Sequence, residues 1–259
     1  MANLGGLAVG STVKLTVNGT LTSFIIIQQG LPSSVYDSSC DGTWLMPESI
    51  YTLRPFGVSV NNYSLSTMHT YLNGDYINLF SEDIKIAIKT VRIPYSKGTG
   101  SSGSLAVGAN GLETKVFLLS AAEMGYSSNY MRIEGAPVSY FNGVDNTQKI
   151  GLYNGNPTIW WLRSPNISGN TTMFYVRQTN GMLVSGAMTN QYGVRPAFIL
   201  PSDITLDENG NIASKSFGGF ANIGGSNKEL TGGHVNISGT WKDISGIYMN
   251  IGGTWKEMP

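Results

Sequence analysis

The residues best suited to chemistry in this chain are polar and aromatic side chains gathered in one segment, residues 166–192. Tyrosine and phenylalanine offer rigid contact area, while asparagine, glutamine, threonine and arginine offer adaptable hydrogen bonds, and this mixture is typical of surfaces that bind ligands. An ordinary surface loop is the simpler alternative. We predict a ligand-binding site with these members: Asn166, Asn170, Thr172, Phe174, Tyr175, Arg177, Gln178, Asn190, Gln191 and Tyr192.

Side chains for nucleophilic catalysis or metal binding are scarce. The chain has two histidines, His69 and His234, and one cysteine, Cys40. A nucleophile needs a base within hydrogen-bonding reach, so we expect no catalytic triad and a buried, unreactive Cys40. The same residues are too few for a zinc or copper site, and phosphate-binding loops are missing, so we predict no metal and no cofactor. Calcium stays open, because it needs only oxygen ligands.

A glycoside hydrolase needs only two carboxylates at a set separation. Sequence does not give their distances, and no motif favours a particular pair. We therefore predict that the protein is not an enzyme, and keep a surface glycan hydrolase as the alternative. The carboxylates available for it are Asp37, Asp41, Glu48, Asp75, Glu113, Glu123, Glu134 and Asp145.

Two apolar segments flank the predicted site and must position it. Residues 159–165 read IWWLRSP and residues 193–198 read GVRPAF, and each predicts a buried strand. We expect Arg163 and Arg195 to hydrogen-bond backbone carbonyls or to pair with a buried carboxylate. The residues that we assign to the core are Trp160, Trp161 and Phe198.

These two motifs resemble the WWLRSP and GVRPA signatures of a bacterial and phage domain family. Further segments resemble that family in the same order, so that the likeness spans about residues 8–205; they are residues 30–33, 36–44, 71–73 and 115–120. The family is similar to the C-type lectin fold, which also carries the variable ligand-binding proteins of diversity-generating retroelements. The resemblance implies that residues 193–196 close a ligand-binding surface. The triplets of calcium-dependent sugar lectins are missing, so the implied fold does not bring lectin chemistry with it.

The pattern of elements predicts the α+β class, with hairpins at two Asn-Gly dipeptides, Asn18-Gly19 and Asn180-Gly181. Serine caps and apolar spacing predict a few short helices, at residues 66–72, ended by Asn73-Gly74, and at residues 81–88. A capping box predicts a third at residues 120–125. These are the elements that would make up a C-type-lectin-like domain over residues 1–205.

An internal period of 14 residues marks the end of the chain. We predict a linker at residues 206–220 and three repeats over residues 221–259, each with two short strands. A segment this short buries little surface by itself. We therefore expect the repeats to act as an attachment module for the domain or as an oligomerisation module that joins copies of the chain. They resemble C-terminal segments of phage tail proteins.

The composition limits the partners. Charged residues make up 12% of the chain and the net charge is zero, so nothing favours binding to nucleic acid or insertion into a membrane. We see no signal peptide and expect synthesis in a bacterial cytoplasm and a place in a phage particle, the virion. We predict a non-enzymatic receptor-binding (adhesion) protein of a phage or prophage, in several copies beside other virion proteins, that binds a bacterial cell-surface protein or glycan. A virion structural or decoration protein is the second alternative.

Overall fold

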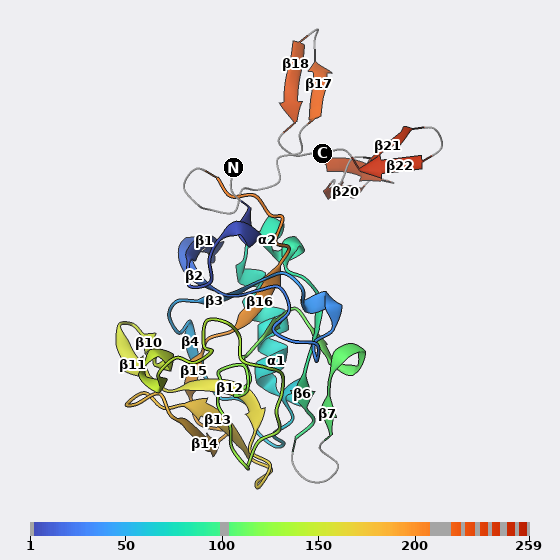
Figure 1. The fold of residues 1–259 in the computed structure, drawn as a ribbon. Coiled ribbons are helices and arrows are strands. Elements are labelled where there is room, and N and C mark those ends of the chain that lie inside the picture. The colour runs from blue at the N-terminus through green and yellow to red at the C-terminus, as the bar shows by residue number, and fades with distance from the viewer. Residues whose placement is uncertain are drawn as a thin grey trace. The chain divides into compact units, whose positions relative to one another are not determined.

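The computed structural model describes residues 3–98 and 104–207, together with the backbone of six strands between residues 219 and 257. The chain divides into two compact units, Met1–Ile212 and Ala213–Pro259. The larger unit combines mostly antiparallel sheets with a few short helices, which confirms the predicted α+β class (Figure 1).

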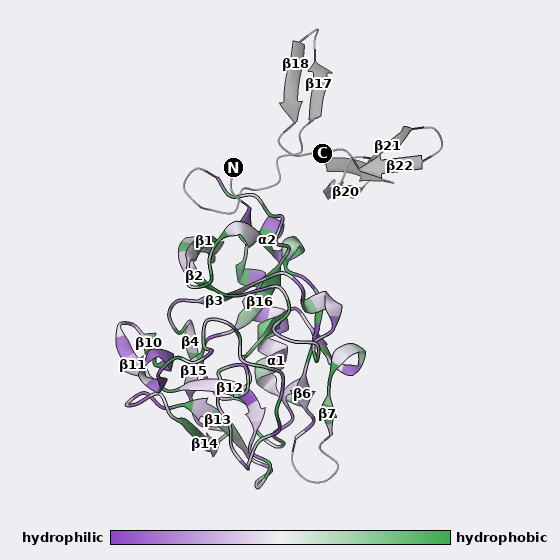
Figure 2. Cartoon of the chain, viewed as in Figure 1, coloured by the Kyte–Doolittle hydropathy of each residue, from purple (hydrophilic) through white to green (hydrophobic). Residues whose placement is uncertain are grey.

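One five-stranded sheet of the larger unit is antiparallel throughout. Its order is β1 (Thr12–Val17), β2 (Thr20–Gln29), β3 (Thr43–Pro47), β16 (Ala197–Leu200) and β9 (Val116–Phe117). The hairpin predicted at Asn18-Gly19 is confirmed, since both residues have positive φ and join β1 to β2. The strand β16 is strongly hydrophobic and fully buried between β3 and β9 (Figure 2).

A second five-stranded sheet carries most of the predicted site. Its order is β14 (Leu183–Ala187), β13 (Thr172–Val176), β12 (Trp160–Pro165), β15 (Tyr192–Val194) and β4 (Thr52–Arg54). The predicted pairing around Asn180-Gly181 is confirmed, because β13 and β14 are antiparallel neighbours, joined by a loop longer than two residues. The central strand β12 is buried at all six positions, although its hydropathy is low (Figure 2).

The second flanking motif is not one strand. Its first half lies in β15, which pairs in parallel with β12, and its second half lies in β16 of the other sheet. The step between them is Arg195-Pro196, where proline cannot donate to a sheet ladder. The motif therefore ties the two sheets together. Trp160, Trp161 and Phe198 are fully buried, as predicted.

Smaller elements complete the unit. Three strand pairs are β5 (Val91–Ile93) with β8 (Leu112–Thr114), β6 (Tyr95–Ser96) with β7 (Leu105–Ala106), and β10 (Gly151–Tyr153) with β11 (Asn156–Thr158). The helices are α1 (Thr67–Tyr71), capped by Ser66, and α2 (Glu82–Ala87), which confirms the helix predicted at residues 81–88.

The helix predicted to end at Asn73-Gly74 continues past it, so that boundary was wrong. A π-helical turn, Leu72–Tyr76, follows α1 directly. The Asn73 amide explains the difference, because its oxygen accepts hydrogen bonds from the Lys115 and Val116 amides and its nitrogen donates to the Val116 carbonyl. Asn73 thus anchors the strand β9 instead of breaking the helix.

The helix predicted at residues 120–125 is a single turn, although its capping box is formed. The Ser120 amide donates to the Glu123 carboxylate at 2.8 Å, and the Glu123 amide donates to the Ser120 hydroxyl at 3.0 Å. Gly125 has a φ of 74° and ends the turn. Glu123 also has a second partner, which holds its side chain in the core.

That partner is Arg163 on β12. Its guanidinium donates to both oxygens of Glu123, at 2.6 and 2.7 Å, and to the carbonyls of Pro94 and Leu118. The Tyr36 hydroxyl donates to the same carboxylate at 2.8 Å. Arg163 and Glu123 are fully buried, and the bidentate geometry offsets the cost of taking both charges out of water. The prediction for Arg163 is therefore confirmed, since its side chain hydrogen-bonds backbone carbonyls and also pairs with a buried carboxylate.

The predictions for Arg195 and Cys40 are also confirmed. The Arg195 side chain is buried and donates to the carbonyls of Pro47 and Glu48. The Cys40 side chain is buried, and burial raises the pKa of its thiol to about 12, which keeps it protonated and unreactive.

The smaller unit contains three antiparallel hairpins, one in each 14-residue repeat. They are β17 (Gly219–Ile223) with β18 (Ser226–Leu230), β19 (His234–Ile237) with β20 (Thr240–Asp243), and β21 (Tyr248–Ile251) with β22 (Thr254–Glu257). Each repeat thus has the two short strands predicted from the period. Most of the predicted linker, residues 208–218, lies outside the described residues.

The buried pair predicts a large effect of one substitution. Glu123→Gln leaves the Arg163 charge buried without its counter-charge, so we expect the free energy of unfolding in urea to fall by about 3–5 kcal/mol. Glu113→Gln is the matched control, since Glu113 is also 2.6 Å from an arginine, Arg92, but on the exposed surface. The Glu113→Gln substitution should lower the free energy of unfolding by about 1 kcal/mol or less. Equal losses in the two variants would contradict the role assigned to the buried pair.

A second buried carboxyl, Glu134, predicts the pH dependence of stability. Burial raises the pKa of Glu134, and Arg163 only partly opposes it. The stability that the neutral Glu134 carboxyl contributes to the fold is fully present below the ordinary glutamate pKa. It is lost as the pH rises through the raised pKa of Glu134. Glu134→Gln cannot ionise, so its free energy of unfolding should decline less than that of the wild type as the pH rises above the ordinary glutamate pKa. Equal slopes for the Glu134→Gln variant and the wild type would refute this.

Candidate functional site

Part of the predicted site forms one face of the second sheet. Residues directly opposite each other in antiparallel strands lie on the same face. Tyr175 is opposite Trp161 on one side and Val184 on the other, and Tyr192 is opposite Arg54. Because the rings of Tyr175 and Tyr192 lie 5.0 Å apart, both tyrosines occupy the same face.

Trp161 forms the floor beneath the two tyrosines. Its ring centroid lies 4.6 Å from that of Tyr192 and 6.2 Å from that of Tyr175, and its indole nitrogen donates to the Arg54 carbonyl. Trp161 is fully buried, whereas both tyrosines are half-buried. Two rings that pack on a fixed indole lose little freedom on meeting a ligand, so the arrangement is pre-organised for contact.

Gly186 and Asn190 complete this surface, which we call the tyrosine face: Tyr175, Tyr192, Gly186 and Asn190 over Trp161. Gly186 lies on β14. A Cβ atom at this position would lie 2.9 Å from the Tyr175 ring, so a side chain here would displace the ring. The Asn190 amide donates to the Tyr192 hydroxyl at 2.8 Å. The tyrosine face therefore offers aromatic area and polar groups together.

Two arginines stand at the ends of the tyrosine face. Arg177 follows Tyr175 by two residues and is exposed, and its charge partly opposes the rise in the pKa of Tyr175, which burial and then Tyr192 cause. Arg54 is exposed opposite Tyr192, with its guanidinium carbon 3.9 Å from the centre of the Tyr71 ring. Of these two, the sequence singled out Arg177 alone.

Other predicted members belong to a loop that a buried asparagine holds. The amide nitrogen of Asn61 donates to the carbonyls of Asn166, Gly169 and Thr172, and its backbone amide donates to the Asn170 carbonyl. Asn166 also donates to Ser185, and its own oxygen accepts from Ser168. Asn166 and Thr172 are half-buried and serve this loop, while the Asn170 side chain is exposed.

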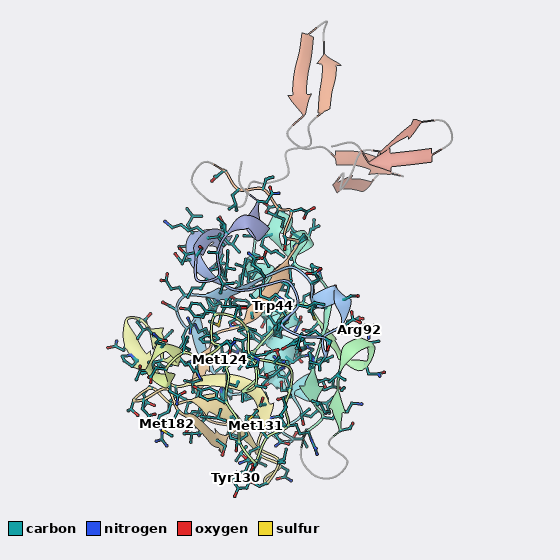
Figure 3. The ribbon with its side chains drawn as sticks, viewed as in Figure 1. Trp44, Arg92, Met124, Tyr130, Met131 and Met182 are labelled. Atoms are coloured by element: carbon teal, nitrogen blue, oxygen red, sulfur yellow. The ribbon has the colours of Figure 1, made fainter. Side chains whose placement is uncertain are left out.

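Phe174 lies on the opposite face of the sheet from Tyr175, because neighbouring residues of a strand point to opposite sides. It is buried and lines a pocket of about 380 Å³ with Met182 and Leu183. Ser127, Ser128 and Asn146 line the same pocket. Figure 3 shows Met182 at the outer edge of the hairpin formed by β13 and β14, far from Arg92. The site is thus divided between two faces.

The last two predicted members flank the sheet. Gln178 is half-buried in the loop after β13, and Gln191 is exposed just before β15. The structure therefore brings together Tyr175, Arg177, Asn190 and Tyr192, and leaves six predicted residues elsewhere. It adds members that sequence reasoning missed as site residues. They are Arg54, Trp161 and Gly186, which only strand register connects with the tyrosines.

Five of the eight carboxylates considered for hydrolysis have structural partners. Glu123 and Glu134 are buried, and Glu113 pairs with Arg92. Asp37 and Asp145 accept backbone amides at the starts of two short turns, and those hydrogen bonds lower the pKa of each carboxyl. The remaining three, all exposed, are Asp41, Glu48 and Asp75.

Within residues 3–98 and 104–207, histidine, cysteine and acidic side chains form no cluster of three suited to a metal ion. In the same part of the chain, none of the helices has the length and apolar character needed to cross a membrane.

The comparisons with known proteins give one match. The model of a family described as a domain of unknown function, DUF6273, matches residues 41–202. This range covers more than half of the chain and holds every member of the tyrosine face. No match was found among curated proteins or among solved structures.

The packing of the two tyrosines predicts a titration effect. Tyr192→Ala removes part of the burial of Tyr175 and a neighbouring ionisable group, so we expect the pKa of Tyr175 to fall toward its ordinary value. Tyrosine ring signals followed by NMR through an alkaline titration would measure it. Tyr153→Ala, in the hairpin of β10 and β11, is the control and should leave Tyr175 unchanged. An unaltered Tyr175 in the Tyr192 variant would mean that the rings do not pack as described.

Proposed function

We propose that this chain, which belongs to the DUF6273 family, is a non-enzymatic binding protein of a phage or prophage particle, and that its tyrosine face contacts a ligand on the bacterial surface. The observation that carries the proposal is the pair of half-buried tyrosines over a buried tryptophan, beside Gly186 and Asn190. Aromatic side chains held in this way dominate the energetics of many binding surfaces.

The scaffold supports a binding role because it fixes the tyrosine face in place. Trp161 is two residues from Arg163 on β12, so the floor is held by the same strand that the buried ion pair anchors. Loops and strand ends then carry the ligand contacts while the sheets keep them in register. We propose a C-type-lectin-like arrangement for the whole domain, on the strength of the α+β class and of the two flanking motifs.

The place in a particle is proposed from the end of the chain. Three hairpins repeat with a period of 14 residues, and among the described strands of this unit each pairs with one partner, so that two-stranded sheets of this kind suit association with other copies or other virion proteins. Several copies would multiply weak contacts at a cell surface into stable attachment. The same repeats favour a second candidate, a virion structural or decoration protein without a specific ligand.

Binding of the labelled full-length protein to a panel of intact bacteria tests the proposal. We expect strain-selective binding in the wild type and a loss of at least tenfold in a Tyr175→Ala, Tyr192→Ala double variant, since truncation of central aromatic contacts costs about 2 kcal/mol or more. The cells' surface polysaccharide is followed for release of fragments, which would instead indicate the hydrolase alternative.

The matched control is Tyr130→Ala with Tyr153→Ala, which also removes two surface tyrosines and should bind as the wild type does. All variants are first compared in urea denaturation, so that lost binding is separated from lost folding. Binding that survives in the Tyr175, Tyr192 variant would refute the tyrosine face as the site. Binding by none of the proteins to any strain, with tight self-assembly, would favour the decoration role.

A further inference from the structure

We infer that the ligand of the tyrosine face is an anionic glycan, a polysaccharide whose sugar rings carry carboxylates. The inference rests on the proposed function and adds the chemical class of the ligand. It follows from the two arginines at the ends of the tyrosine face and from the ring surface between them.

The charges lie on the two sides of the strand that carries Tyr192. Arg177 is exposed just beyond the end of β13, two residues after Tyr175, and its charge acts on Tyr175. Arg54 on β4 is the cross-strand partner of Tyr192. Because β15 lies between β4 and β12, and β13 pairs with the other side of β12, the strand of Tyr192 lies between the two cations.

Neither cation is neutralised within the described part of the chain. Salt bridges there join Lys85 to Glu82, Arg92 to Glu113 and Arg163 to Glu123, and none involves Arg54 or Arg177. Two exposed guanidiniums without carboxylate partners are notable in a chain with only 12% charged residues and no net charge.

The Arg54 guanidinium is also oriented. Its carbon lies 3.9 Å from the centre of the Tyr71 ring, which holds the planar group by a cation–π contact. Guanidinium groups bind carboxylates through two parallel hydrogen bonds, and a fixed group loses less freedom when it does so. The partner chemistry that fits this end of the face is a planar anion.

The surface between the arginines suits sugar rings. Tyrosine rings present apolar faces with a polar edge, and the hydroxyl of Tyr192 is already held by Asn190. Gly186 has no side chain, which leaves room for the Tyr175 ring to lie beside it. A chain of sugar rings with carboxylates would satisfy the aromatic area and both cations together, whereas a neutral glycan would leave the cations unused.

The test uses the full-length protein and a strain that it binds. We expect Arg54→Gln with Arg177→Gln to weaken cell binding at least tenfold and to flatten its dependence on salt, because screening acts on the charges that the variant removes. Lys14→Gln with Lys97→Gln is the charge-matched control, on β1 and just after β6, and should bind as the wild type does. Polygalacturonate, alginate and polysialic acid are added as competitors, each beside its methyl-esterified form.

We expect at least one acidic polymer to compete tenfold more strongly than its neutral ester. Competition by the esters to the same degree, or cell binding that ignores both salt and the arginine variant, would overturn the carboxylate assignment. So would competition by polyphosphate alone, or by none of the polymers. In each of these cases the Tyr175, Tyr192 variant still reports on the proposed function by itself, because its loss of cell binding does not depend on the class of ligand.

Discussion

The buried pair of Arg163 and Glu123 is the interaction on which the rest of the larger unit depends. It joins the central strand β12 to the turn at Ser120 and, through carbonyls of Pro94 and Leu118, to two further segments. A charge pair in this position stabilises the fold only while its geometry is complete, because each partner alone is a buried charge. The core is therefore specified by hydrogen-bond geometry as well as by apolar packing.

The arrangement of side chains in the tyrosine face depends on that interaction. Trp161 is placed by β12, Tyr175 by its pairing with β12, and Tyr192 by β15, which pairs with the same strand. A surface assembled from neighbouring strands of one sheet can vary in the side chains that it presents while its backbone stays in place. This division of labour separates the residues that meet a ligand from those that hold the sheet, and it explains why Phe174, one residue from Tyr175, has no part in the face.

The sequence predicted the α+β class, the first hairpin, the buried tryptophans and the partners of both buried arginines, because composition and local pattern carry that information. It misjudged the end of the helix at Asn73, where a tertiary role of the amide overrides local preference. For the site, a segment 27 residues long was predicted, of which the structure gathers four members. Which face a residue occupies depends on strand register, and Arg54 lies more than a hundred residues from Tyr175, so no local pattern could have joined them.

The position of β16 has a mechanical consequence. The strand β16 is the last strand of the larger unit and is held between β3 and β9, and the amides of Leu4 and Gly5 donate to the carbonyls of Ile204 and Ser202 beyond it. Because β16 pairs on both sides, removing it from the sheet would break hydrogen bonds to two strands, whereas an edge strand is bonded on one side only. The C-terminal end of the larger unit is thus held in place by two neighbouring strands and by amides from the beginning of the chain.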